Sequence, residues 1–326
     1  MGTVSSTRMK AVEREVRGEI MRTDIFVKLV SETRSEADLN RDLSDAFSMF
    51  RDIGSRFSRF QNDSELSRLN VSSEIAVSPE MAALLSEALV LYRETDGVFD
   101  PSILPNLEKE GYAGSFGSES FGVPASGNAS DSFAFDSLSV DLLTGIIRKP
   151  AGLRIDLGGI AKGYAVDRVV RMLRERGNED FLVDAGGDIY TSGCDTERGY
   201  GYWAIDVAVP SEVAGPPPLL MLRNVAVATS GTDRRRWTTV DGSLKHHLID
   251  PRTGKSAVTD ILSATVVGDT VLQAEVFAKT LCILGRDQAF PFAEKRHIPT
   301  FLVTTDGKTV YTDHMRPFMF NANETE

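Results

Sequence analysis

The sequence has few cysteines and no long apolar run. Its 326 residues include only two cysteines, Cys194 and Cys282, too few for a disulfide framework like that of small secreted domains. No apolar run reaches the roughly 20 residues of a membrane-spanning helix. Residues 1–20 carry charges throughout and lack the apolar segment of a signal peptide or lipoprotein signal. We therefore expect a charged leader at residues 1–20 and a cytoplasmic protein, although a shortened sequence would look the same.

Positive charge is also in deficit, since the formal net charge is -11. Nucleic acids and anionic membranes repel a chain of this sign, so neither is an expected partner. Hydrophobic residues make up 41% of the chain, which is enough to build a core in a soluble globular protein. Any basic site must therefore be local and specific.

The most informative stretch runs from Asp156 to Tyr164 and reads DLGGIAKGY. Its two adjacent glycines allow a ligand to approach the backbone closely, and the amides that open the following helix can bind a phosphate. Lys162 adds a positive charge at the same place. The residues alone leave two interpretations open: an anion site, or a tight turn at Gly158 and Gly159 beside a solvated lysine.

Hydrophobic periodicity predicts the elements around this stretch. Gly177 is a natural C-cap for the helix that follows it, and Ser78 with Pro79 opens another helix as N-cap and first residue. A stretch rich in Gly and Ser at 113–132 is expected to be a mobile loop. The predicted strands are 24–30, 146–148, 153–155, 181–190 (broken by a glycine pair), 203–209, 225–229 and 262–267, and the other predicted helices are 35–57 and 270–284.

Residues 156–167, DLGGIAKGYAVD, closely resemble the signature of the ApbE family. These flavin transferases move FMN from FAD onto a threonine of a partner protein, with release of AMP. Further motifs resemble the family's in the same order along the chain. The resemblance implies one α+β, T-fold-related domain at 21–320, with mixed or antiparallel sheets and flanking helices. It also implies FAD as the substrate and an acceptor protein as the partner.

The resemblance further implies which residues contact FAD. Phe60 takes the position of the aromatic residue that stacks on the isoalloxazine ring, and the segment from Val98 to Pro101 resembles one that lies along the flavin. Without the resemblance, Phe60 would be expected in the core and Asp100 at the start of a turn. The expected FAD-binding residues are Met21 (followed by Arg22 where the family has glycine), Phe60, Val98, Phe99, Asp100, Asp156, Lys162 and Ile249.

His247 is the candidate catalytic residue. The segment from His247 to Gly254 resembles the family's H-x-I-D-P-x-T-G motif, whose histidine is proposed to take the proton of the acceptor threonine. Histidine suits this task because its unperturbed pKa of about 6.5 leaves a neutral base near pH 7. The residues alone favour the alternative that His246 and His247 form a pair that bonds a nearby carbonyl.

The expected Mg²⁺ site departs from the family pattern A-D-x-x-x-T. Glu275 stands in place of the aspartate and Lys279 in place of the threonine. An ammonium has no lone pair and cannot bind a metal. Either Glu275 and a backbone carbonyl such as that of Gly159 hold a weak Mg²⁺ site, or Lys279 replaces the cation. In the second case its ammonium should lie roughly 2.7 to 2.9 Å from Glu275 or from a phosphate oxygen.

Two further questions stay open from the sequence. Three arginines at 234–236 beside Trp237 could serve the phosphates of FAD or simply face solvent. The departures at Glu275 and Lys279 also leave an alternative function, in which the protein binds FAD, or slowly hydrolyses its pyrophosphate, without transfer.

Overall fold

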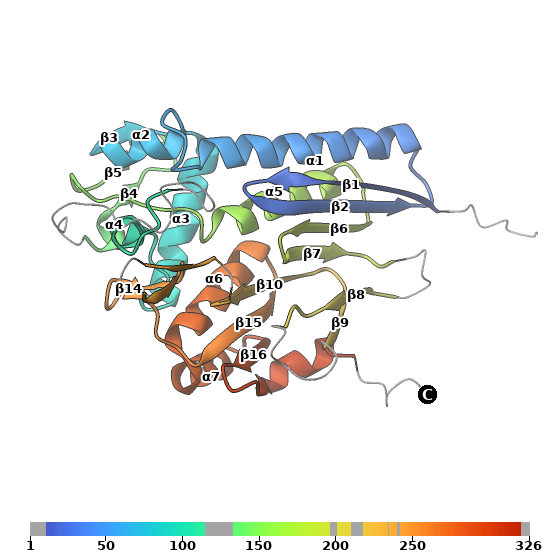
Figure 1. The fold of residues 1–326 in the computed structure, drawn as a ribbon. Coiled ribbons are helices and arrows are strands. Elements are labelled where there is room, and N and C mark those ends of the chain that lie inside the picture. Colours follow the sequence, from blue (N-terminus) through green and yellow to red (C-terminus); the bar gives the residue numbers. More distant parts are fainter. Residues whose placement is uncertain are drawn as a thin grey trace, which may run out of the picture.

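An eight-stranded antiparallel sheet forms the centre of the computed structural model (Figure 1). The structure describes residues 11–114, 133–195, 201–209, 218–233, 235–239 and 242–320. In spatial order the strands are β1 (Val12–Ile20), β2 (Thr23–Ser31), β6 (Asp180–Ala185), β7 (Asp188–Ser192), β10 (Val225–Gly231), β15 (Ile261–Gly268), β16 (Thr300–Thr304) and β17 (Thr309–Tyr311). Together with the helices, this antiparallel sheet confirms the predicted α+β class.

Three long helices cover one face of the sheet: α1 (Glu36–Arg56), α5 (Ala161–Glu175) and α6 (Val271–Leu284). Alternate residues of β2, such as Val27 and Leu29, point into this layer and are fully buried. The opposite face carries β8 (Trp203–Asp206), β9 (Leu219–Leu222) and the 3-10 helix η3 (Asp313–Phe318), which share a second apolar cluster with β10, β15 and β16. Among the described residues, no helix has the length and apolarity to cross a membrane.

Most of the remaining elements that Figure 1 labels lie on its left, and the last of the α-helices lies at the bottom, packed against α6. The helical ones are α2 (Glu65–Val71), α3 (Pro79–Glu94), η1 (Pro101–Ile103), α4 (Leu104–Lys109), η2 (Phe135–Ser137) and α7 (Arg286–Lys295). The strands form three small sheets: β3 (Glu74–Ala76) with β5 (Ile146–Arg148) and β4 (Ser139–Val140), β11 (Arg236–Thr238) with β12 (Leu244–His246), and β13 (Ile249–Asp250) with β14 (Lys255–Ser256).

Local sequence signals explain where the main helices begin and end. Ser78 accepts a hydrogen bond from the amide of Met81, and Pro79 is the first residue of α3, as predicted. Thr270 caps α6 in the same way, through the amide of Gln273. Gly177 follows the end of α5 with a φ of +79°, the left-handed conformation that glycine adopts without strain.

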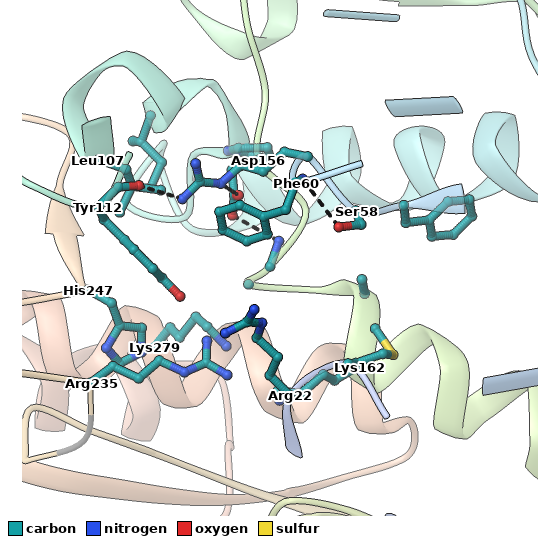
Figure 2. Close-up of a pocket in the computed structure, with 18 of the residues that line it drawn as sticks. Arg22, Ser58, Phe60, Leu107, Tyr112, Asp156, Lys162, Arg235, His247 and Lys279 are labelled. Carbon is teal, nitrogen blue, oxygen red and sulfur yellow. Dashed lines mark hydrogen bonds and ion pairs between the residues drawn. The ribbon is translucent and has the colours of Figure 1, made fainter. Parts of the chain in front are cut away.

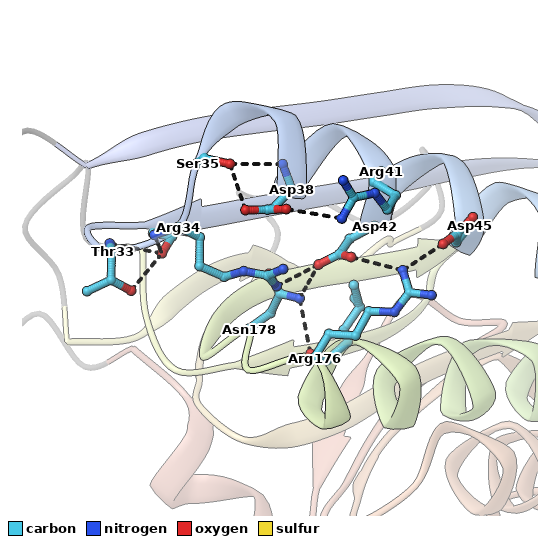
Figure 3. Close-up of polar contacts among 11 residues, drawn as sticks. Thr33, Arg34, Ser35, Asp38, Arg41, Asp42, Asp45, Arg176 and Asn178 are labelled. Carbon is cyan, nitrogen blue, oxygen red and sulfur yellow. Dashed lines mark hydrogen bonds and ion pairs between the residues drawn. The ribbon is translucent and has the colours of Figure 1, made fainter.

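A buried polar network fixes α1 against the end of α5 (Figure 3). The carboxylate of Asp42 on α1 accepts hydrogen bonds from Arg34, Arg176 and Asn178, at 2.6 to 2.9 Å. Burial tends to raise the pKa of Asp42, but these three donors outweigh it and the pKa lies below its usual value. Asp42 is therefore ionised at neutral pH, and its hydrogen bonds hold α1 against the end of α5.

The structure corrects two predictions. Residues Val12–Ile20, assigned to the leader, form the edge strand β1 and pair with all of β2; their charged side chains hid the strand because an edge strand exposes most of its residues. Residues 153–155 are not a strand, since the backbone of Ile155 bonds with the side chain of Asn70 instead. Most of the loop expected at 113–132 lies outside the described residues.

Candidate active site

A cavity of about 530 Å³ opens where the long helices meet the smaller elements. This size suits a nucleotide-sized ligand. The expected metal ligand Glu275 is not on its wall, because its side chain is fully buried. All the other expected site residues line the cavity: Met21, Phe60, Val98, Phe99, Asp100, Asp156, Gly159, Lys162, His247, Ile249 and Lys279.

Met21 and Arg22 reach the cavity from the tight turn between β1 and β2. Ile20 pairs with Thr23, so these two residues are the whole turn. Both have positive φ, at 57° and 56°, as a two-residue turn between right-twisted strands requires. Glycine would adopt this conformation without strain, so Arg22 tolerates some backbone strain and brings a guanidinium to the wall (Figure 2).

Aromatic rings line the side of the cavity around Phe60. The ring centroid of Phe60 lies 6.3 Å from that of Tyr112, which in turn lies 5.8 Å from that of Trp237. Phe60 keeps 42% of its surface exposed, so it is not the core residue that the sequence alone would suggest. Tyr112 was missed from the sequence because only the fold brings it near Phe60.

Arg59 holds this aromatic side in place, and it too was missed. Its guanidinium lies 4.2 Å from the centre of the Phe60 ring and donates to the backbone carbonyl of Tyr112 at 2.6 Å. It also pairs with Asp156 at 2.7 Å. The other oxygen of Asp156 accepts the amide of Gly158 at 2.9 Å. Within the described residues, Asp156 therefore acts by orienting Arg59 and the glycine turn.

Asp100 stabilises the loop that carries Phe99. Its Oδ1 accepts hydrogen bonds from the amide and the hydroxyl of Ser102, at 2.7 and 2.6 Å. Burial raises the pKa of Asp100 against the effect of these bonds. Val98 and Phe99 are both nearly buried beside it. The turn predicted at Asp100 is thus present, and it presents Val98 and Phe99 to the cavity.

The two histidines have different surroundings. The Nε2 of His246 lies 3.0 Å from the carbonyl of Ala257, and its Nδ1 accepts the amide of Leu248. Burial lowers the pKa of His246, so it is a neutral structural residue. His247, half-buried, lines the cavity. The carbonyl-bonded histidine considered from the sequence therefore exists, and it is His246.

A buried ionic cluster joins α5 and α6 at the cavity. Oε1 of Glu275 accepts hydrogen bonds from the ammonium groups of Lys162, at 3.0 Å, and Lys279, at 2.9 Å. Its Oε2 accepts the amide of Gly163 at 2.8 Å. Lys162 also contacts the buried carboxylate of Asp188 on β7, a partner that the sequence did not indicate. The distance between Lys279 and Glu275 agrees with that expected if Lys279 replaces a cation.

The charges of this cluster follow from burial and pairing. Burial tends to raise the pKa of Glu275, but the ammonium groups of Lys162 and Lys279 outweigh it and bring the pKa to about 2. Burial lowers the pKa of Lys162 to about 8, against the attraction of Glu275. Glu275 is therefore ionised and Lys162 mostly protonated at pH 7.

These residues do not fit a magnesium ion. Mg²⁺ requires near-octahedral coordination by oxygen at about 2.1 Å. Both oxygens of Glu275 already accept N–H donors, and Lys279 offers a further donor instead of an oxygen ligand. In the part of the chain that the structure describes, no three His, Cys, Asp or Glu side chains are grouped to hold a metal ion. No step of the chemistry is therefore assigned to a metal here.

Gly163, which the sequence analysis did not single out, is required by the packing of α5 against α6. A Cβ atom on Gly163 would lie 2.7 Å from the backbone of Leu272, which is closer than real Cβ atoms approach. At Gly159, one of the two glycines predicted to admit a ligand, a Cβ atom would lie 3.4 Å from Cε of Lys279 and 3.8 Å from the Phe99 ring. Lys279 and Phe99 therefore lie directly beside this glycine.

An antiparallel sheet covered by helices, with a cavity that is aromatic on one side and cationic on the other, has the form of a site for an aromatic phosphate ester (Figure 2). The chain belongs to the ApbE family, whose model matches residues 21–302. This establishes the family resemblance seen in the sequence motifs.

Relatives and solved structures agree with this assignment. The chain is 26% identical over 294 residues to an FAD:protein FMN transferase of Haemophilus influenzae, covering 88% of this chain and 85% of the relative. It is 29% identical over 279 residues to one of Vibrio cholerae, covering 83% and 82%. The solved structure of the flavin transferase ApbE from Vibrio cholerae matches with a TM-score of 0.77 at 25% identity, over 95% of this chain and all of that one.

Proposed function

We propose that this protein transfers FMN from FAD to a threonine of an acceptor protein and releases AMP. The relatives named FAD:protein FMN transferase support this activity. The observation that carries it is the presence of His247 on the wall of the cavity that also presents Lys162, Lys279 and Arg235. A base beside a cluster of cations is the arrangement that phosphoryl transfer needs.

In this proposal the chemistry of the cavity wall gives FAD one orientation. The isoalloxazine ring would lie against Phe60, near Val98 and Phe99, because aromatic and apolar surfaces favour each other. The pyrophosphate would then face Lys162 and Lys279, where its negative charge is neutralised. Figure 2 shows Lys279, Arg235 and His247 across the cavity from Phe60.

The proposed reaction is a single displacement at phosphorus. The hydroxyl oxygen of the acceptor threonine attacks the phosphorus of the FMN half of FAD. A phosphoester bond to threonine forms while the phosphoanhydride bond to AMP breaks, and AMP leaves with the bonding electron pair. His247 takes the hydroxyl proton, and the ammonium groups of Lys162 and Lys279 stabilise the charge that builds up on the phosphate oxygens.

The test is formation of a covalent FMN adduct. We would incubate the full chain with FAD, Mg²⁺ and a peptide that carries a flavinylation motif, and follow peptide mass and AMP release. His247→Ala should slow adduct formation by at least about 100-fold, a typical effect of losing a general base. His314→Ala, which removes a half-buried histidine outside the cavity, is the matched control. Persistently unmodified peptide would contradict the proposal.

The alternative function is FAD binding with slow pyrophosphate hydrolysis and no transfer. The observation in its favour is the pairing of Lys279 with Glu275 at the positions where the family pattern provides metal ligands. In this case FAD would yield free FMN and AMP at equal rates while the peptide stays unmodified. Chromatography of the nucleotides beside the peptide mass distinguishes the two functions.

A further inference from the structure

The cavity wall is basic although the chain as a whole is acidic. Among the described residues, two that line the cavity are acidic, Asp100 and Asp156, whereas the net charge of the chain is -11. Six described lining residues are basic: Arg22, Arg51, Arg59, Lys162, Arg235 and Lys279. Asp156 pairs with Arg59, and the buried carboxylates of Asp188 and Glu275 pair with the two lysines. The described basic groups still outnumber these four carboxylates by two.

Two of these cations stand where the ApbE pattern has uncharged residues. Lys279 replaces the threonine of A-D-x-x-x-T, and Arg22 follows Met21 where the family has glycine. Arg22 does so in spite of a φ of +56°, a conformation that costs a non-glycine residue about 1 kcal/mol. Both substitutions bring positive charge to the same cavity. Together they add two charges, which equals the charge of one magnesium ion.

Lys279 is fixed in position from two sides. Its ammonium donates to Glu275, which is fully buried, and its methylene groups pass close to Gly159. Its side chain is 14% exposed and lines the cavity. An ammonium has three N–H donors. Within the described residues one of them bonds to Glu275, so the other two can face a ligand in the cavity.

We propose that Lys279, held by Glu275 beside Lys162 and assisted by Arg22, is a built-in cation that replaces Mg²⁺, so that FAD binding and FMN transfer by this protein need no divalent metal. This inference rests on the proposed function and specifies how the pyrophosphate is neutralised. A fixed ammonium needs no metal-binding step. Glu275 is fully buried, and both of its oxygens already accept N–H donors of the protein.

FAD binding with and without metal tests this directly. The full chain is treated with EDTA, and the FAD dissociation constant is measured by calorimetry in EDTA and in excess Mg²⁺. We expect the two constants to agree within about twofold, because the charge is neutralised by side chains. FAD affinity at least tenfold higher in Mg²⁺ would overturn the inference while leaving the proposed function intact. Failure to bind FAD under either condition would overturn both.

Two substitutions of Lys279 separate charge from metal binding. Lys279→Met removes the ammonium and adds no oxygen ligand, so FAD affinity in EDTA should fall about tenfold, the effect of one charge-assisted hydrogen bond, and Mg²⁺ should not restore it. Lys279→Thr should show the same loss of FAD affinity in EDTA, but Mg²⁺ should restore part of that affinity. Lys308→Met, at an exposed lysine outside the cavity, controls for the loss of a charge.

A further variant guards against a general folding defect. Lys279→Arg keeps the positive charge, so its FAD affinity should stay independent of Mg²⁺. Thermal unfolding by circular dichroism should show that each Lys279 variant is folded at the assay temperature. Wild-type affinity in EDTA for a folded Lys279→Met variant would overturn the inference.

Discussion

The ammonium nitrogen of Lys279 lies 2.9 Å from Oε1 of Glu275, one turn earlier on α6. This spacing usually produces an exposed ion pair of little consequence, but here Glu275 has no exposed surface. Lys162 of α5 bonds to the same oxygen. The packing of α5 against α6 is therefore coupled to the charge that the cavity presents.

Removing the negative charge of Glu275 should destabilise the fold. Glu275→Gln leaves the ammonium groups of Lys162 and Lys279 close together without the carboxylate that both contact. Loss of one partner of a buried pair costs about 3 to 5 kcal/mol, so we expect the free energy of unfolding to fall by that order. Urea denaturation measures it. Glu36→Gln, at an exposed glutamate paired with Arg14, should change it by less than about 1 kcal/mol.

Asp167 should make stability depend on pH in an unusual direction. It caps α6 through the amides of Val271 and Leu272, at 2.9 and 3.0 Å, and burial raises its pKa to about 6 in spite of these bonds. Between pH 4 and pH 6 the folded protein thus holds a proton that the unfolded chain releases. The contribution of Asp167 to stability is therefore present at low pH and is lost as the pH rises through 6.

The variant Asp167→Asn tests the direction of this pH dependence. The difference in unfolding free energy, wild type minus variant, should shrink by up to roughly 3 kcal/mol between pH 4 and pH 6, since one pKa unit corresponds to about 1.4 kcal/mol. Urea denaturation at several pH values gives the difference. An increase with pH would show that Asp167 is stabilised as the carboxylate. Asp63→Asn, at an exposed position, controls for the loss of a carboxyl group.

Gly163 should be needed for the packing of α5 against α6. The Cβ of Gly163→Ala would lie 2.7 Å from the backbone of Leu272, so the two helices would have to move apart. Such overpacking typically costs about 1 to 3 kcal/mol, and we expect the free energy of unfolding to fall by that order. Urea denaturation measures it. Gly201→Ala, whose Cβ would meet no atom within 4 Å, should change it by less than about 1 kcal/mol.

Phe60 should contribute to FAD binding more than to stability. Because 42% of its surface is exposed, Phe60→Ala should lower the free energy of unfolding by less than about 1 kcal/mol. Loss of a stacked pair should weaken FAD binding about three- to tenfold. Quenching of flavin fluorescence measures the affinity. Phe320→Ala, which removes a ring with 39% of its surface exposed and outside the cavity, should have no such effect.

Local signals made much of the fold predictable from the sequence. The capping residues Ser78 and Thr270 and the terminal glycine Gly177 act within one helical turn of their own element, so short patterns suffice to locate helix ends. Apart from Glu275, the residues that the motifs single out, from Met21 to Lys279, line one cavity. A motif of this kind already encodes which distant segments meet.

The sequence did not predict features that depend on contacts with distant segments of the chain. The charged strand β1 exists because it pairs with β2 along its whole length. Asp188 and Tyr112 belong to the site only because the sheet and α4 bring them near Lys162 and Phe60. The burial of Glu275 could not be predicted either, since the spacing of Glu275 and Lys279 is equally suited to an exposed pair.

The most direct test of the account is FMN transfer in the presence of EDTA. The full chain, stripped of metal, is incubated with FAD and a peptide that carries a flavinylation motif, and the mass of the peptide is followed over time beside a reaction that contains Mg²⁺. We expect an FMN adduct and an equal amount of AMP, at rates that agree within about threefold with and without Mg²⁺, because Lys162 and Lys279 stabilise the phosphate charge. An adduct that forms only when Mg²⁺ is present would contradict it.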